Sequence, residues 1–192
     1  MKTLVIIGSH NKSSFNNSIK ERVVEELKQK NHEIIVRDLY ELQFDPVLTT
    51  KDFERLQTGN LPSDIKTEQD YISWAEKIVV IYPVWWTGLP AILKGYFDRV
   101  LLYGFAYKFD DKGLVKLLEG KEALIFSTSG MPKEAYESIG MYDAMKLTSD
   151  TGIFDFTGIK VKKHIFFPSV TSVSDDVRKT YLEETAEEIK KF

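Results

Sequence analysis

The chain has 192 residues, of which 43% are hydrophobic and 29% are charged, and a formal net charge of −3. We expect one domain over residues 1–192 with a full core, and the slightly acidic balance argues against a nucleic-acid-binding protein. The absence of cysteine excludes disulfides, thiol catalysis and cysteine-ligated zinc. Because no apolar segment predicts a signal peptide or a membrane span, we expect a cytoplasmic protein without membrane insertion.

Strand-like apolar segments alternate with helical patterns along the chain. Phe15, Ile19, Val23 and Leu27 recur at helical spacing and predict a helix over 14–30, with Ser13 or Ser14 as its cap. The predicted strands are 3–8, 33–39, 78–83, 122–130 and 159–168. The other predicted helices are a short one near 51–56, then 68–77, 91–102, 133–148 and 174–192, and 103–113 is predicted as a loop.

This alternation predicts an α/β fold with a doubly wound parallel sheet between two helical layers. The first and third strands are apolar on both faces, as strands buried in a parallel sheet are. Five strands fit the flavodoxin-like order 2-1-3-4-5. In that order ligands bind at the carboxyl ends of the strands, so the loops after the first, third and fourth strands are the candidate site.

The first of these loops, GSHNKSSFNNS from Gly8, leads into a helix N-terminus rich in serine and asparagine. Free backbone N–H groups and side-chain donors there predict an anion site, and a phosphate is the natural occupant. His10 could add a charge or a hydrogen bond. The alternative is simple helix capping by a solvated loop. Neither the GxGxxG nor the Walker pattern is present.

The other two loops carry aromatic and small residues. PVWWTGL, from Pro83, could bind the edge of a flat heterocycle through its backbone while an indole packs on the ring face. The alternative is that both tryptophans are core or subunit-interface residues. In STSGM, residues 127–131, small side chains let the backbone approach a ligand closely.

The remaining histidines carry no motif. His32 and His164 have no histidine or carboxylate at ligand spacing, so we expect no metal site. The chain also has no GxSxG motif for a catalytic serine.

Together these segments allow a comparison with a known family. PVWWTGLPAILKGYFDRVL, residues 83–101, resembles the most characteristic segment of the flavodoxin-fold NAD(P)H:quinone oxidoreductases. The stretch 38–53, the segment GFAYKF (104–109) and the S-T-S-G turn are also similar to that family. The resemblance extends over roughly the whole chain and is nearest to the short bacterial members. It implies that the protein is a flavoenzyme.

The resemblance also implies roles for individual residues. The phosphate end of the flavin would be surrounded by His10, Ser14, Phe15 and Asn16. The isoalloxazine ring would be lined by Pro83, Val84, Trp85, Trp86 and Thr87, and its other edge by Thr128, Ser129 and Gly130. Trp86 matches the family's flavin-site tryptophan, whereas the position of Trp85 contributes mainly backbone. Trp86→Ala is therefore expected to weaken flavin binding more than Trp85→Ala.

Three further residues are implied at the reacting side of the flavin. Tyr136 is the nearest match to a tyrosine that polarises the reduced flavin, so it is the expected catalytic residue. The family's active site lies at a two-fold dimer interface. Tyr107 and Phe109 would then reach the pocket of the partner subunit, and with Thr87 they would contact the electron acceptor.

The reaction implied is a ping-pong hydride transfer from NADPH or NADH to FMN, with FAD as the alternative cofactor. A small flat acceptor such as a quinone then takes two electrons. Two other functions stay open. Some relatives are ancillary regulatory subunits of potassium-efflux systems. A flavodoxin-type electron carrier is disfavoured by the missing T-x-T-G-x-[ST] loop and the modest charge.

Overall fold

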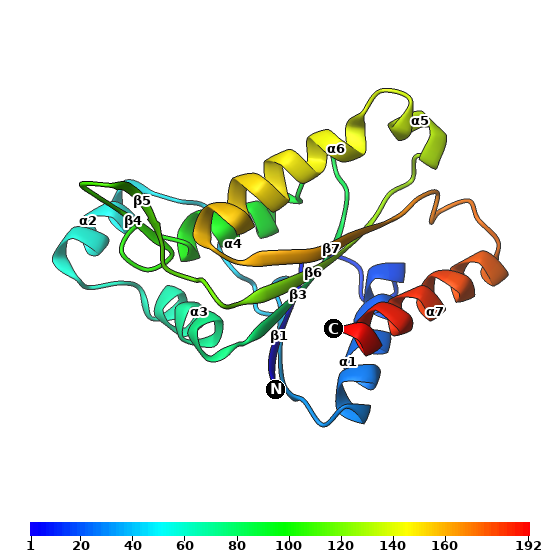
Figure 1. Cartoon of the computed structure of the whole chain (residues 1–192), viewed down its shortest axis with the longest axis horizontal. Coiled ribbons are helices and arrows are strands. Elements are labelled where there is room, and N and C mark those ends of the chain that lie inside the picture. The colour runs from blue at the N-terminus through cyan, green and yellow to red at the C-terminus, as the bar shows by residue number, and fades with distance from the viewer.

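The computed structural model describes residues 1–192, built around a twisted sheet of five parallel strands (Figure 1). The strands are β1 (Lys2–Ile7), β2 (Glu33–Asp38), β3 (Lys77–Pro83), β6 (Glu122–Thr128) and β7 (Lys160–Phe167). Their spatial order is β2-β1-β3-β6-β7. Because β4 and β5 form a separate hairpin, this order is 2-1-3-4-5 among the sheet strands, and the predicted fold is confirmed.

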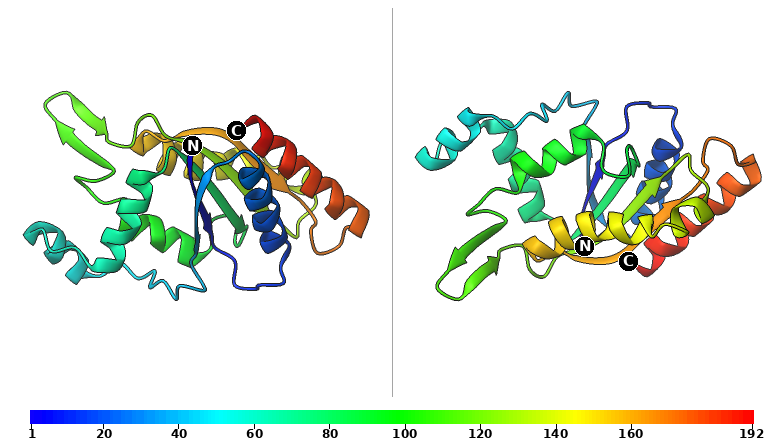
Figure 2. Two further views of the ribbon diagram at one scale, coloured as in Figure 1. Left: turned by 90° about the horizontal axis from the view of Figure 1, so that it is seen from below. Right: turned by 90° about the horizontal axis from the view of Figure 1, so that it is seen from above.

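Helices cover both faces of the sheet and complete the predicted three layers (Figure 2). One face is covered by α1 (Phe15–Gln29) and α7 (Asp175–Lys191). The other is covered by α3 (Ser63–Trp74), α4 (Ala91–Val100) and the helical segment of α6 (Met141–Lys146) and the π-helix η1 (Leu147–Asp155). Side chains alternate along each strand, so Val5 and Ile7 join one core while Leu4 and Ile6 join the other.

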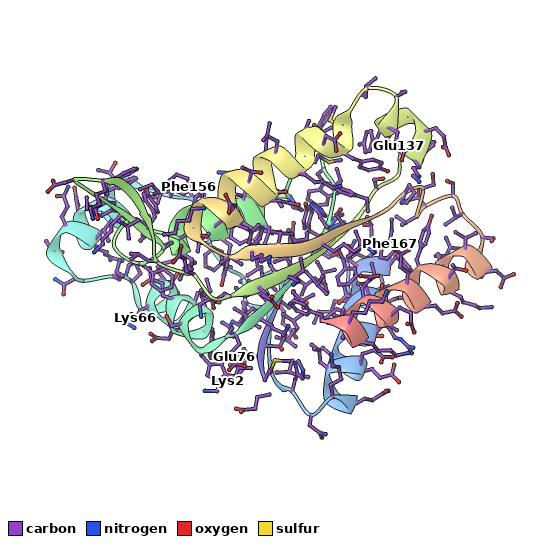
Figure 3. The ribbon with its side chains drawn as sticks, in the orientation of Figure 1. Lys2, Lys66, Glu76, Glu137, Phe156 and Phe167 are labelled. Atoms are coloured by element: carbon purple, nitrogen blue, oxygen red, sulfur yellow. The ribbon has the colours of Figure 1, made fainter.

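Phe167 shows how the last strand is fixed to the layer of α1 and α7 (Figure 3). Its ring is stacked on Phe126 of β6 and on Tyr181 of α7, with centroid separations of 6.3 and 4.8 Å. Phe167 is almost fully buried. The end of β7 therefore holds the following loop in a defined place beside the carboxyl end of β6.

The segment predicted as a loop at 103–113 forms a β-hairpin instead. Strands β4 (Tyr107–Asp110) and β5 (Gly113–Lys116) pair in antiparallel fashion, with Asp110 opposite Gly113. The Asp110 side chain accepts a hydrogen bond from the Lys112 backbone N–H at 2.8 Å, and Gly113 has a φ of 112°. This turn chemistry is typical of short hairpins and was the signal available in the sequence.

The helix predicted over 133–148 is divided and extends further. Helix α5 (Lys133–Glu137) is separated from α6 by Gly140, which has a φ of 68°. The chain then continues from α6 into η1 instead of ending at residue 148. Thr148 and Ser149 both donate side-chain hydrogen bonds back to the Met145 carbonyl. Such hydroxyl contacts compete with regular helical hydrogen bonds, and no periodic pattern in the sequence predicts them.

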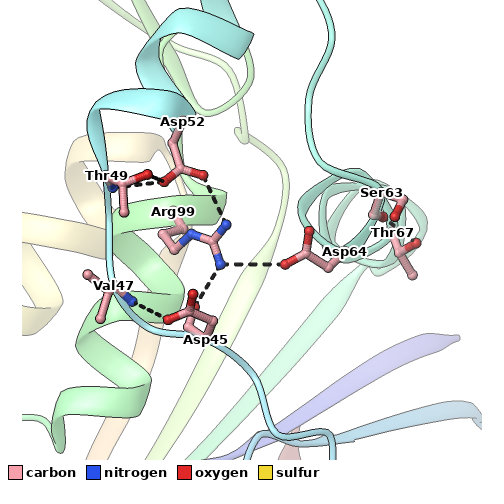
Figure 4. Close-up of polar contacts among 8 residues, drawn as sticks. All are labelled: Asp45, Val47, Thr49, Asp52, Ser63, Asp64, Thr67 and Arg99. Carbon is pink, nitrogen blue, oxygen red and sulfur yellow. Dashed lines mark hydrogen bonds and ion pairs between the residues drawn. The ribbon is translucent and has the colours of Figure 1, made fainter.

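Arg99 on α4 holds the segment between β2 and α3, which includes α2 (Thr50–Thr58), against the helical layer (Figure 4). Its guanidinium donates to Asp52 Oδ1 at 2.9 Å and to the Asp45 carbonyl at 2.7 Å. One turn earlier, a Cβ on Gly95 would lie 2.1 Å from the Pro46 carbonyl oxygen. Gly95 and Arg99, which both belong to the PAILKGYFDRV motif, therefore have a structural role here. None of the helices is both long and apolar enough to cross a membrane.

Candidate functional site

A cavity of about 380 Å³ lies at the carboxyl ends of β1, β3 and β6. It is formed by the three loops predicted from the sequence and by the loop between β7 and α7, which was not predicted. We call it the switch-point cavity, because it lies where the strand order reverses. Its lining is Ser9, His10, Asn11, Ser14, Phe15, Asn16, Pro83, Val84, Trp85, Thr128, Ser129, Gly130, Val170 and Thr171. All the predicted cofactor residues except Trp86 and Thr87 are among these.

The N-terminus of α1 presents several free donors to this cavity. Ser14 is the N-cap residue, but its hydroxyl does not cap the helix and lies 2.9 Å from the Ser9 hydroxyl. The backbone N–H groups of Phe15 and Asn16 make no backbone hydrogen bond. Free N–H groups at the positive end of a 15-residue helix favour an anion. The donor set therefore suits a phosphate group.

Asn16 and Thr128 link the first loop to the carboxyl end of β6. Asn16 Nδ2 donates to Thr128 Oγ1 at 3.0 Å, and Thr128 Oγ1 lies 3.3 Å from Asn16 Oδ1. Both side chains are buried. A hydrogen bond between two buried groups is costly to break, so it fixes the two cavity walls relative to each other.

The wall opposite β6 is aromatic. The His10 ring lies 5.3 Å from the Trp85 ring and 6.2 Å from the Tyr40 ring, measured between centroids. Trp85 is 39% exposed, so a flat ligand can still cover part of the indole. Stacking on such an indole is favourable for an aromatic ring.

The structure places the two tryptophan side chains differently, and the roles expected for them in flavin binding stay predictions. Trp85 lines the cavity, whereas the Trp86 side chain is 100% exposed and lies outside it. Trp86 and Thr87 are the central residues of a tight turn that is closed by hydrogen bonds between Trp85 and Gly88 in both directions, each 3.1 Å long. Adjacent residues of the chain point in different directions, so only one indole can face the cavity.

This tight turn also has an unusual backbone. Trp86 and Thr87 have φ values of 49° and 59°, in the left-handed region that favours glycine. Such residues cost about 1–3 kcal/mol each and are concentrated at functional sites. Neither backbone N–H has a hydrogen-bond acceptor in the chain. The turn therefore offers two neighbouring unpaired donors beside Trp85.

Tyr136, Tyr107 and Phe109 are not brought to the switch-point cavity. Tyr136 lies on α5, where its ring packs edge-on against Tyr142 with centroids 5.6 Å apart. Tyr107 and Phe109 lie on the β4–β5 hairpin, at the opposite end of the molecule from α5 in Figure 1. The roles assigned to these three residues stay predictions.

Four cavity residues were missed in the sequence. Ser9 and Asn11 flank the predicted His10, and the first loop as a whole was the signal for them. Val170 and Thr171 follow β7, where the Val170 N–H donates to the Ser129 carbonyl at 3.0 Å. Because β7 pairs with β6, its carboxyl end meets the same edge of the sheet, which is the signal that could have found them.

Known proteins similar to this chain share its fold over most of its length. A family model described as Flavodoxin-like fold matches residues 1–192. An uncharacterized NAD(P)H oxidoreductase of Haemophilus influenzae is 37% identical over 186 residues, which cover 95% of this chain and 92% of that protein. NAD(P)H dehydrogenase (quinone) 1 of Rattus norvegicus is 32% identical over 205 residues, covering 95% and 74%.

A solved structure shows the same similarity in three dimensions. The NAD(P)H:quinone oxidoreductase from Methanothermobacter marburgensis superposes with a TM-score of 0.90 at 26% sequence identity. The superposition covers 98% of this chain and 97% of that one.

Proposed function

Because the chain belongs to the Flavodoxin-like fold family, whose model matches residues 1–192, we propose that it is a flavin-dependent NAD(P)H oxidoreductase. The acceptor is a quinone or a similar flat molecule. The observation that carries the proposal is the switch-point cavity, whose lining includes both anion donors and an indole. Relatives named for NAD(P)H and quinone oxidoreduction, at 37% and 32% identity, support this class of donor and acceptor.

The residues present fit a flavin mononucleotide. Its phosphate would be held by the N–H groups of Phe15 and Asn16 and by the hydroxyls of Ser9 and Ser14, all at one end of the cavity. No lysine or arginine lines the cavity, so neutral donors and the α1 N-terminus would carry phosphate binding. FMN is the cofactor we favour, with FAD as the alternative.

The ring system would be held at the other end of the cavity. Trp85 supplies a flat apolar surface, and Pro83, Thr128 and Gly130 complete the walls. The unpaired N–H groups of Trp86 and Thr87 are donors suited to the carbonyl and nitrogen acceptors of an isoalloxazine edge. In this proposal Trp86 acts through its backbone, and the strained turn is retained because it directs these two donors.

When bound, FMN supplies a two-electron carrier that reduced nicotinamide can reduce and a quinone can reoxidise. Overall, NADH or NADPH loses a hydride, and the acceptor gains two electrons and two protons, the second proton coming from water. Donor and acceptor would use the same site in turn, which is a ping-pong order. The chain binds and orients the reactants, and its fixed N–H donors stabilise negative charge that develops on the ring.

We further propose that the active protein is a homodimer in which Tyr107 and Phe109 contact the partner subunit's pocket. Phe109 is 57% exposed on the hairpin, which is unfavourable for a large apolar side chain in water. Neither residue lines the cavity of its own chain. Thr87 lies in the tight turn that follows the cavity residue Trp85, and it is the residue of this chain that we assign to the acceptor pocket.

Turnover tests the proposal directly. The full chain reconstituted with FMN should oxidise NADH or NADPH when menadione is the acceptor. Plots of reciprocal rate against reciprocal donor concentration should be parallel at different menadione concentrations. Absence of turnover with both donors and with both FMN and FAD would contradict the proposed reaction.

A further inference from the structure

A second cavity, separate from the switch-point cavity, lies between α4 and η1. Its volume is about 230 Å³, and it shares no lining residue with the switch-point cavity. We call it the α4–η1 cavity. The residues that define it are Tyr82, Leu89, Lys94, Met145, Ser149 and Ile153.

The α4–η1 cavity is an apolar pocket with one polar side. Leu89, Met145 and Ile153 supply apolar walls, while the hydroxyls of Tyr82 and Ser149 lie together. Lys94 Nζ also lines the cavity; it is exposed and is paired with Asp98 at 2.5 Å, so the cavity has no unpaired charge from this residue. Apolar walls with a few convergent polar groups are the usual composition of a small-molecule site. The paired lysine favours a neutral ligand.

A buried polar cluster lies behind Tyr82. His164, which has no carboxylate neighbour in the sequence, is placed by the fold with its Nδ1 2.8 Å from Asp150 Oδ1. A carboxylate only accepts hydrogen bonds, so Nδ1 carries the hydrogen and Nε2 is the acceptor. Burial lowers the pKa of His164, although Asp150 opposes this effect, and the ring is held neutral at neutral pH.

Two hydroxyl groups compete for the one lone pair of His164 Nε2. The Ser127 hydroxyl lies 3.1 Å from Nε2 and the Tyr82 hydroxyl 3.3 Å. Only one of them can donate a full hydrogen bond to it. When Ser127 does so, the Tyr82 hydroxyl turns to the cavity side, where the Ser149 hydroxyl is its neighbour and a ligand oxygen would compete to accept its hydrogen. Burial raises the pKa of Tyr82, so it stays a phenol and a donor at physiological pH.

We propose that the α4–η1 cavity binds a neutral aromatic molecule of one or two rings whose carbonyl oxygen accepts a hydrogen bond from Tyr82. The volume agrees with this class, since an apolar cavity of about 150 Å³ is enough to bind benzene. The π-helix supplies Ser149 and Ile153 to the wall, and irregular helices of this kind are frequent at functional sites. His164 and Ser127 are positioning residues for Tyr82.

This site goes beyond the proposed oxidoreductase function and does not depend on it. Gly88 and Leu89 line the α4–η1 cavity, whereas Pro83 and Trp85 line the switch-point cavity. The two cavities therefore flank the same short loop. The site can be tested by binding alone, with no flavin present.

The test is an NMR titration of the full chain, without flavin and again with FMN added, using acetophenone and ethylbenzene as probes. The two probes have nearly the same shape but only acetophenone has an oxygen. Amide shift changes should be confined to Gly88, Leu89 and the residues 145–153. In Tyr82→Phe the affinity for acetophenone should fall about fivefold, the effect of one neutral hydrogen bond, and that for ethylbenzene should not change.

Further variants separate this role from general damage to the fold. Ile153→Trp should abolish binding of both probes, and Tyr71→Phe, on α3 and not among the residues that line the cavity, should change neither. Ser127→Ala should weaken acetophenone alone, because Tyr82 is then the only donor left for His164. The proposal is overturned if neither probe binds, if the shifts map to the switch-point cavity, or if Tyr82→Phe weakens both probes equally.

Discussion

Asn16, in the first turn of α1, and Thr128, at the end of β6, are joined by a buried hydrogen bond. The Asn16 amide nitrogen donates to the Thr128 hydroxyl oxygen at 3.0 Å. Both line the switch-point cavity, and each is the other's only side-chain hydrogen-bond partner. The contact sets the separation of the loop expected to bind the flavin phosphate from the loop expected to meet its ring.

Asn16→Ala should therefore weaken FMN binding about tenfold, because both the wall separation and the first turn of α1 lose a fixed point. Fluorescence titration of FMN measures this. Asn60→Ala, an exposed residue after α2, is the matched control and should have no effect. Unchanged FMN affinity in Asn16→Ala would show that the contact does not shape the site.

The two tryptophans should respond to truncation in the order that the structure indicates. Trp85→Ala removes an indole from the cavity wall and should weaken FMN binding by about 1–3 kcal/mol. Trp86→Ala removes a side chain that is outside the cavity and keeps the backbone N–H, so FMN affinity should change little. Calorimetric titration of both variants decides between this order and the one expected from the family resemblance, in which Trp86 contributes more.

Arg99 should be essential for stability, because it holds the segment around α2 through Asp52 and the Asp45 carbonyl (Figure 4). Arg99→Met leaves a buried carboxylate unpaired and should lower the free energy of unfolding by about 3–5 kcal/mol in urea. Arg55→Met, an exposed arginine on α2, is the control and should cost less than about 0.5 kcal/mol. Equal costs in the two variants would contradict the structural role of Arg99.

The ion pair between Arg99 and Asp52 also predicts that the stability of the fold depends on pH. Burial alone would raise the pKa of Asp52, but hydrogen bonds from Arg99 and Thr49 bring it below its usual value. A carboxyl group with a depressed pKa in the folded chain stabilises the fold fully above its usual pKa. The stability difference between the natural chain and Asp52→Asn should therefore shrink as the pH falls below about 4. A difference that stays constant there would argue against a charged Asp52.

His164 should make the stability of the fold depend on pH in a second, higher pH range. Its pKa is lowered in the folded chain by burial, so the unfolded chain takes up a proton at a higher pH than the folded chain does. The stabilising contribution is complete above the ordinary histidine value of 6.5 and is lost as the pH falls through the lower folded value. Urea unfolding should show this loss as the pH falls below the ordinary histidine value of 6.5 in the natural chain, and a smaller loss in His164→Gln.

Much of the candidate site could be predicted because parallel sheets bring the carboxyl ends of their strands to one edge. Ser14, Pro83 and Thr128 are far apart in the sequence, yet each lies at or just after the carboxyl end of a strand that the apolar pattern identifies. Once the order 2-1-3-4-5 is known, their loops must meet. The same rule also applies to Thr171 after β7, which was missed because only three of the five strand ends were considered.

Other features could not be predicted because they depend on backbone conformation and on contacts between distant residues. The sequence of two adjacent tryptophans does not indicate that Trp86 takes a positive φ. That backbone conformation decides which of the two indoles faces the cavity. The contact between His164 and Asp150 arises only because η1 continues past residue 148 and packs on β7. The hairpin at 107–116, by contrast, had a readable turn in Asp-Asp-Lys-Gly.

The measurement that tests the central claim most directly is the titration of the flavin-free full chain with FMN, followed by the fluorescence of the flavin. The switch-point cavity predicts saturable quenching at one FMN per chain with a Kd of about 1 µM or lower, weakened in Asn16→Ala and Trp85→Ala and unchanged in Asn60→Ala. Quenching that does not saturate at about 100 µM, or that is identical in all four proteins, would contradict a flavin site in this cavity.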